Sequence, residues 1–135
     1  MDMDTSKWNL LDAKEPSTLA DGQEVKLQIC RAYHNPRDDG SAFFNIMSMV
    51  VDDPYANIIK TFLEVPIEIE GKTTGALLNK YMFEMRTFLE AHGIDPVNPG
   101  GPTEWIGKTA NAIVSLTSDR GGKEENRVKQ WVMSE

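Results

Sequence analysis

The sequence has little cysteine, no long hydrophobic run and fewer cationic than acidic residues. Its single cysteine, Cys30, excludes an internal disulfide and an all-cysteine zinc site within one chain. The longest apolar run, residues 43–51, is interrupted by Asn45 and Ser48 and is far shorter than the roughly 20 residues of a membrane span. The acidic start has no hydrophobic segment behind it, so we expect no secretory signal. These absences predict an intracellular protein in a reducing compartment, with no membrane partner.

Cationic residues are outnumbered by acidic ones, 14 to 21, which gives a net charge of −7. On average, such a charge argues against a nucleic-acid partner. Residues 1–24 hold six acidic and two cationic residues, whereas residues 108–135 hold four acidic and five cationic ones. The C-terminal quarter is therefore locally basic, with a net charge of +1. Global acidity keeps the protein soluble without excluding a local anion-binding surface.

Catalytic signatures are also missing from the sequence. It has no P-loop, dinucleotide fingerprint or nucleophile elbow, and its two Gly-Gly pairs lack the flanking residues of such motifs. Cys30 and His34 are four residues apart across a strand end, a spacing that does not place two metal ligands on one face. His92 stands alone at a helix end, where histidine commonly bonds to carbonyl groups. We therefore expect no enzyme activity, no metal and no cofactor.

Hydrophobic periodicity predicts a mainly β protein with one α-helix. Period two predicts strands at residues 24–33, 42–52, 58–67, 109–117 and 127–133. Apolar residues spaced by three and four predict a helix from Thr74 to His92, with Gly93 as its C-terminal cap. Three strands, a helix and two strands is the element order of the OB-fold, a five-stranded Greek-key barrel closed at its base by the helix. An SH3-like barrel is the alternative, and the long helix at this position favours the OB-fold.

The domain organisation follows from the same pattern. The chain of 135 residues is long enough for one domain with a proper core and too short for two. We expect a loose arm at residues 1–23, before an OB-fold domain at residues 24–135. Turn-forming residues dominate the end of the arm, and Trp8, Leu10 and Leu11 offer an anchor onto the core.

The last strand offers a candidate nucleic-acid surface. Arg127, Lys129 and Trp131 are alternate residues of this strand, so they would lie on one face. There they would present cations for phosphates and a flat ring for a base. Lys123 in the preceding turn extends this surface. The alternative is that Trp131 packs in the core, because one bulge in the strand would shift the parity by a full face.

Three segments resemble a group of small bacteriophage OB-fold proteins. They run from Phe88 to Asp95, from Trp105 to Ala112 and from Gly122 to Lys129, within a likeness that covers roughly residues 19–132. Members of this group are regarded as single-stranded-DNA-binding or replication-accessory proteins. The resemblance implies non-catalytic, sequence-tolerant binding of single-stranded DNA during phage replication or recombination, in the cytoplasm of an infected bacterium.

We expect this binding in a groove across the outer faces of the first three strands and the last hairpin. The candidate phosphate contacts are Lys26, Arg31, Arg37, Lys60, Lys123, Arg127 and Lys129. The candidate stacking residues are Tyr33, Phe43, Tyr55 and Trp131. Replication or recombination proteins are further candidate partners, and a homodimer or a cooperative assembly on DNA would offset weak binding by each chain. Two alternatives remain open: a protein-interaction module that docks on a replication partner, and a structural or decoration domain of the virion.

Overall fold

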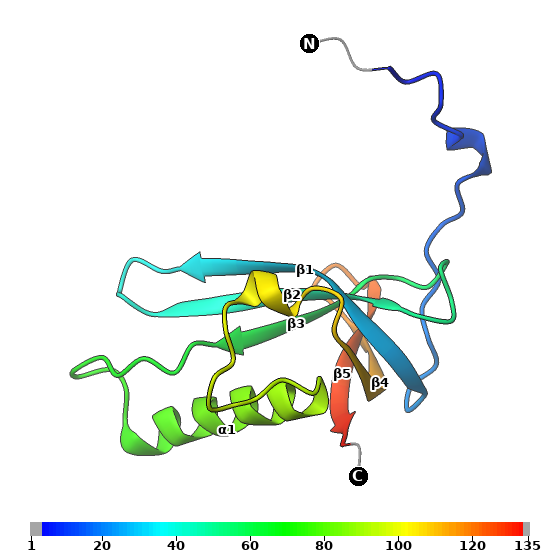
Figure 1. The fold of residues 1–135 in the computed structure, drawn as a ribbon. Coiled ribbons are helices and arrows are strands. Elements are labelled where there is room, and N and C mark those ends of the chain that lie inside the picture. Colours follow the sequence, from blue (N-terminus) through cyan, green and yellow to red (C-terminus); the bar gives the residue numbers. More distant parts are fainter. Residues whose placement is uncertain (1–3, 134–135) are drawn as a thin grey trace.

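The computed structural model describes residues 4–133 and shows one antiparallel sheet with a helix against it (Figure 1). The ends of the expected arm and domain, residues 1–3 and 134–135, lie outside the described residues. The strands are β1 (Glu24–Pro36), β2 (Ala42–Val50), β3 (Ile59–Glu64), β4 (Thr109–Ser118) and β5 (Glu124–Val132). The helices are the 3-10 helix η1 (Leu10–Asp12), the α-helix α1 (Gly75–Ala91) and the 3-10 helix η2 (Pro102–Trp105). The sheet order is β3-β2-β1-β4-β5, with α1 between β3 and β4, which confirms the mainly β, OB-like fold.

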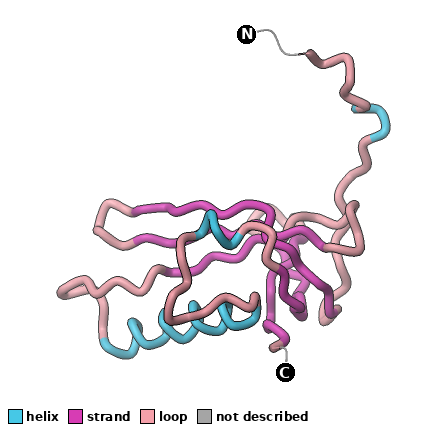
Figure 2. The backbone as a smooth tube through the Cα atoms, viewed as in Figure 1, coloured by secondary structure: helices cyan, strands magenta, loops and turns pink. Residues whose placement is uncertain are grey.

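β1 connects the two halves of the sheet. Residues 24–28 pair with β4, and residues 27–36 pair with β2. A bulge at Cys30, between the paired residues Ile29 and Arg31, allows the strand to bend. β3 and β5 lie at the two ends of the sheet and contact each other. Within residues 4–133 no backbone ladder joins them, so the barrel is partly open (strands are magenta in Figure 2).

The helix begins and ends near the predicted residues, for the predicted reasons. Thr74 is the N-cap, and its hydroxyl accepts a hydrogen bond from the Leu77 N–H at 3.2 Å. Gly93 follows the C-cap with a φ of +69°, a backbone conformation that favours glycine. Within residues 4–133, no helix is both long enough and apolar enough to cross a membrane.

Three strand boundaries differ from the predicted ones by three residues. β1 runs to Pro36 rather than ending at Tyr33, because residues 34–36 pair with residues 42–44 of β2. β3 ends at Glu64 rather than near residue 67, because Pro66 has no N–H to continue the pairing. β5 begins at Glu124, three residues earlier than expected, because Glu124 and Glu125 pair with the end of β4. Because these two residues are both polar, the alternation of apolar and polar residues that predicts a strand does not extend to them.

The core consists of two clusters that meet at Trp131. One cluster contains Phe88 and Leu89 of α1 together with Ile46 and Trp105, so the helix closes the base of the barrel. The other contains apolar side chains from β1, β2, β3 and β4 at the opposite end. Trp131 of β5 packs against both clusters. Full burial of each such side chain contributes about 1.5–3 kcal/mol to folding.

The expected anchor of the arm is wrong. Trp8, Leu10 and Leu11 are 50%, 70% and 101% exposed, whereas Leu19 is 6% exposed and belongs to the core. The Leu19 N–H donates to Asn126 Oδ1 at 2.8 Å, and Asn126 Nδ2 donates back to the Leu19 carbonyl at 3.0 Å. Local composition does not reveal this anchor, because it depends on a residue 107 positions away in the sequence.

Asn126 should be a large contributor to stability. Its buried amide also donates to the Ser115 carbonyl and accepts from Asn57 Nδ2. Asn126→Ala should lower the free energy of unfolding by about 3 kcal/mol, because several buried polar groups lose their partner at once. Urea unfolding measures the change, with Asn111→Ala as control, since Asn111 is exposed on β4. Equal losses for the two variants would contradict this role.

Candidate nucleic-acid interface

Three rows of paired side chains cover the outer face of β1, β2 and β3. Directly paired residues point to the same side of a sheet, so each row brings together one side chain from each strand. We define the outer face as these rows: Arg31, Met47 and Lys60; Tyr33, Asn45 and Phe62; Asn35, Phe43 and Glu64. The alternate residues of β2 and β3, including Ile46 and Leu63, point into the core.

Aromatic rings and guanidinium groups are stacked on this face. The rings of Phe43 and Phe62 lie 6.0 Å apart, centroid to centroid. Arg37, from the β1–β2 loop, lies over the Phe43 ring at 4.7 Å, and Arg127 of β5 lies over the Phe62 ring at 4.7 Å. Tyr33 and Phe62 are 43% and 48% exposed. The outer face therefore presents two kinds of flat, partly exposed group: aromatic rings and guanidinium planes.

The charges on the face are partly neutralised. Glu64 accepts two hydrogen bonds from Arg37, one of them at 2.8 Å, and this contact raises the pKa of Arg37. Arg127 pairs with Glu125 at 3.3 Å. Arg31 donates to the Tyr33 hydroxyl at 3.0 Å, and neither Arg31 nor Lys60 has a carboxylate partner among residues 4–133. Two cations are thus free for an anion, and two more are held by carboxylates at the surface.

The structure brings six of the predicted site residues together on or beside the outer face. They are Arg31, Tyr33, Arg37, Phe43, Lys60 and Arg127. Three others lie elsewhere. Lys26 lies where β1 pairs with β4, in a separate hollow lined also by Asp52 and Asp53. The Tyr55 ring lies under Lys14 at 4.5 Å, and Lys123 lies in the β4–β5 turn.

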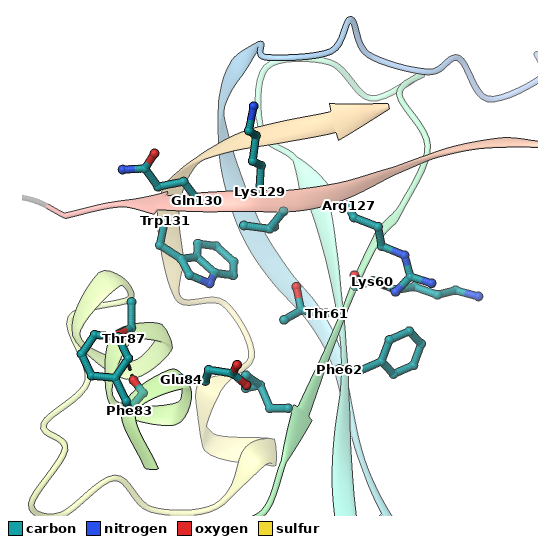
Figure 3. Close-up of a pocket in the computed structure, with 12 residues that line it drawn as sticks. Lys60, Thr61, Phe62, Phe83, Glu84, Thr87, Arg127, Lys129, Gln130 and Trp131 are labelled. Carbon is teal, nitrogen blue, oxygen red and sulfur yellow. Dashed lines mark hydrogen bonds between the residues drawn. The ribbon is translucent and has the colours of Figure 1, made fainter. Parts of the chain in front are cut away.

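A bulge in β5 separates Trp131 from Arg127. β4 pairs with Val128 and then with Gln130, so Lys129 is an extra residue that shifts the parity. Trp131 therefore points toward α1, while Lys129 points away from it (Figure 3). The Trp131 ring lies 5.5 Å from that of Phe88, measured between centroids. The prediction that Arg127, Lys129 and Trp131 share one face is wrong, and Trp131 is half-buried.

Phe62 is the residue of this face that the sequence reasoning missed. It has the same parity as Lys60 in β3, whereas the buried residues Ile59 and Leu63 have the other. This alternation was visible in the sequence and could have identified Phe62 as an outward-facing aromatic residue.

A groove of about 440 Å³ lies between β3, β5 and α1, next to the outer face (Figure 3). Phe62, Phe83 and Trp131 are the aromatic residues of its lining. Arg127 spans the gap between the unpaired strands, because its Nη1 donates to the Lys60 carbonyl at 3.5 Å. The groove therefore occupies the place where a backbone ladder would have closed the barrel.

Two of the residues weighed as metal ligands, Cys30 and His92, bond to backbone carbonyls. Cys30 donates its thiol hydrogen to the Met47 carbonyl at 3.2 Å. His92 Nδ1 lies 2.7 Å from the Phe88 carbonyl, and burial lowers the pKa of His92. Among residues 4–133, no three His, Cys, Asp or Glu side chains are grouped so as to hold a metal ion.

No protein-family model matches the chain, and no curated protein matches it.

Stability should depend on pH through His92. Because burial lowers the pKa of His92 from its ordinary value of 6.5, the unfolded chain takes up this proton at a higher pH than the folded protein does. Stability should fall as the pH drops from 7, by up to about 1.4 kcal/mol per pH unit. His92→Gln should remove this contribution while His34 remains in both proteins. Urea unfolding between pH 7 and 5 measures it, and parallel stability curves for the two proteins would contradict it.

Trp131 and Phe62 should respond differently to truncation. Trp131→Ala should lower the free energy of unfolding by about 3 kcal/mol, because the ring packs against both core clusters. Phe62→Ala should lower it by less than about 1 kcal/mol, because the ring is 48% exposed. Thermal and urea unfolding of both variants measure the difference. A fully stable Trp131→Ala protein would show that the indole is not a core residue.

Proposed function

We propose that this protein binds single-stranded DNA without strong sequence preference, as a non-catalytic accessory in phage replication or recombination. The cytoplasm of the infected bacterium is where it would act. The observation that carries the proposal is the outer face, which gathers three aromatic rings and two uncompensated cations beside two Arg–Phe stacks. OB-folds bind oligonucleotides on this part of the barrel, the strands 2–3 face.

The outer face would bind bases by stacking. Tyr33 offers an exposed ring, and the guanidinium planes over Phe43 and Phe62 offer further flat surfaces on which bases stack. Every base has a π-face, so this mode of binding tolerates any sequence. Arg31 and Lys60 lie in one row across the strands, where they can contact successive phosphates.

The acidic residues beside the site would moderate its affinity. Phosphates compete with Glu64 for Arg37 and with Glu125 for Arg127. The net charge of −7 also opposes the approach of DNA at long range. We therefore expect modest affinity per chain, which falls steeply as the salt concentration rises.

Substitutions on the face should separate stacking from charge. Tyr33→Ala and Phe43→Ala should each weaken binding to an oligo-dT by about 1–3 kcal/mol, with little change in salt dependence. Lys60→Ala should reduce the slope of log affinity against log salt by about 0.7, as expected for one lost phosphate contact on a single strand. Fluorescence polarisation at low salt measures both quantities.

The chain offers matched controls for these variants. Tyr55→Ala and Lys26→Ala change the same residue types away from the outer face and should leave affinity unchanged. Glu64→Gln should raise affinity, because it frees Arg37 for phosphate. No binding of the wild-type protein at tens of micromolar would contradict the proposal. Binding to a basic replication protein instead would select the interaction-module alternative, and incorporation into purified particles would select the virion alternative.

A further inference from the structure

The segment of residues 4–16, here called the arm, projects from the barrel with uncovered apolar side chains (Figure 1). Its hydrogen bonds within the described chain are all local, such as Trp8 N–H to the Thr5 carbonyl and Asp12 N–H to the Asn9 carbonyl. Leu11 is 101% exposed and no residue of η1 is buried. A soluble monomer rarely exposes a contiguous apolar group of this kind without a partner for it.

The groove between β3, β5 and α1 is the second uncovered apolar feature. Phe83 of α1 is 67% exposed, and it lines the groove together with the half-buried Trp131 (Figure 3). A volume of about 440 Å³ lies within the range, roughly 300–1,000 Å³, of clefts that bury most of a bound ligand.

We propose that the arm of one copy of this protein docks in the groove of a second copy. Trp8, Leu10 and Leu11 would supply apolar side chains to Phe83 and Trp131. Aromatic and aliphatic anchors that fill such a pocket are the usual source of binding energy at protein interfaces.

The charges of the two features are complementary. Asp4 and Asp12 flank the apolar part of the arm, and Lys7 is the one cation between them. Lys14, further along, is already held over the Tyr55 ring at 4.5 Å. The groove lining contains three cations, Lys60, Arg127 and Lys129, of which Lys129 points away from α1, and one acid, Glu84. An acidic, apolar segment therefore meets a cationic, apolar groove.

A second copy, rather than the same chain, is the occupant that the geometry favours. The arm leaves the barrel well away from α1, which forms one wall of the groove (Figures 1 and 2). The arm and the groove are different surfaces, so the contact is head-to-tail and can continue from copy to copy. This contact requires no DNA, so it can be tested independently of the proposed function.

Self-association of the full chain without DNA tests the proposal. Sedimentation equilibrium should show concentration-dependent association of the wild-type protein. The double substitution of Leu10→Ser with Leu11→Ser should weaken it at least tenfold, and so should Phe83→Ser. All three side chains are exposed, so the variants should fold. Val97→Ser is the matched control, because Val97 is an apolar residue that is 90% exposed and does not line the groove.

Mixing the two defective variants gives the sharper result. The arm variant keeps an intact groove and the Phe83→Ser variant keeps an intact arm, so an equimolar mixture should form a heterodimer and nothing larger. Three outcomes would overturn the proposal: a wild-type protein that stays monomeric at several hundred micromolar, a Phe83→Ser variant that associates like the wild type, or a mixture that forms no heterodimer.

Discussion

The bend of β1 at Cys30 is the constraint on which the rest of the structure depends. On one edge, Ile29 pairs with Ser48 of β2. On the other, the Ile29 N–H donates to the Lys108 carbonyl at 2.9 Å, and the Gly107 N–H donates to the Ile29 carbonyl at 2.8 Å. One strand thereby belongs to both halves of the sheet. The two halves face each other across the core, and their free edges, β3 and β5, meet without pairing.

Much of this fold was predictable because its local signals agree with one another. Alternating apolar residues identify the strands, and the spacing of apolar residues in α1 identifies its buried side. Thr74 and Gly93 mark the helix ends with the chemistry that such ends need. Four of the candidate site residues, Arg31, Tyr33, Phe43 and Lys60, also lie together, because the alternation along β1, β2 and β3 is regular over the outer face.

The remaining features depend on contacts that no local pattern encodes. The extra residue Lys129 reverses the side on which Trp131 lies, and bulges have no dependable sequence signature. Leu19 is an anchor only because the Asn126 amide reaches it across the sheet. Apolar character alone favoured Trp8 as the anchor. Composition tells which residues are suited to burial, whereas the tertiary structure decides which of them are buried.

Arg127 links the closure of the barrel to both proposed surfaces. It covers the Phe62 ring on the outer face, pairs with Glu125 and reaches the Lys60 carbonyl across the open side of the barrel. Phe62 and Lys60 belong to the outer face and also line the groove. A phosphate that drew Arg127 away from Lys60 would change the same wall that a docked arm contacts. If both proposals hold, DNA binding and arm docking are therefore thermodynamically linked, and each must change the affinity of the other by the same factor.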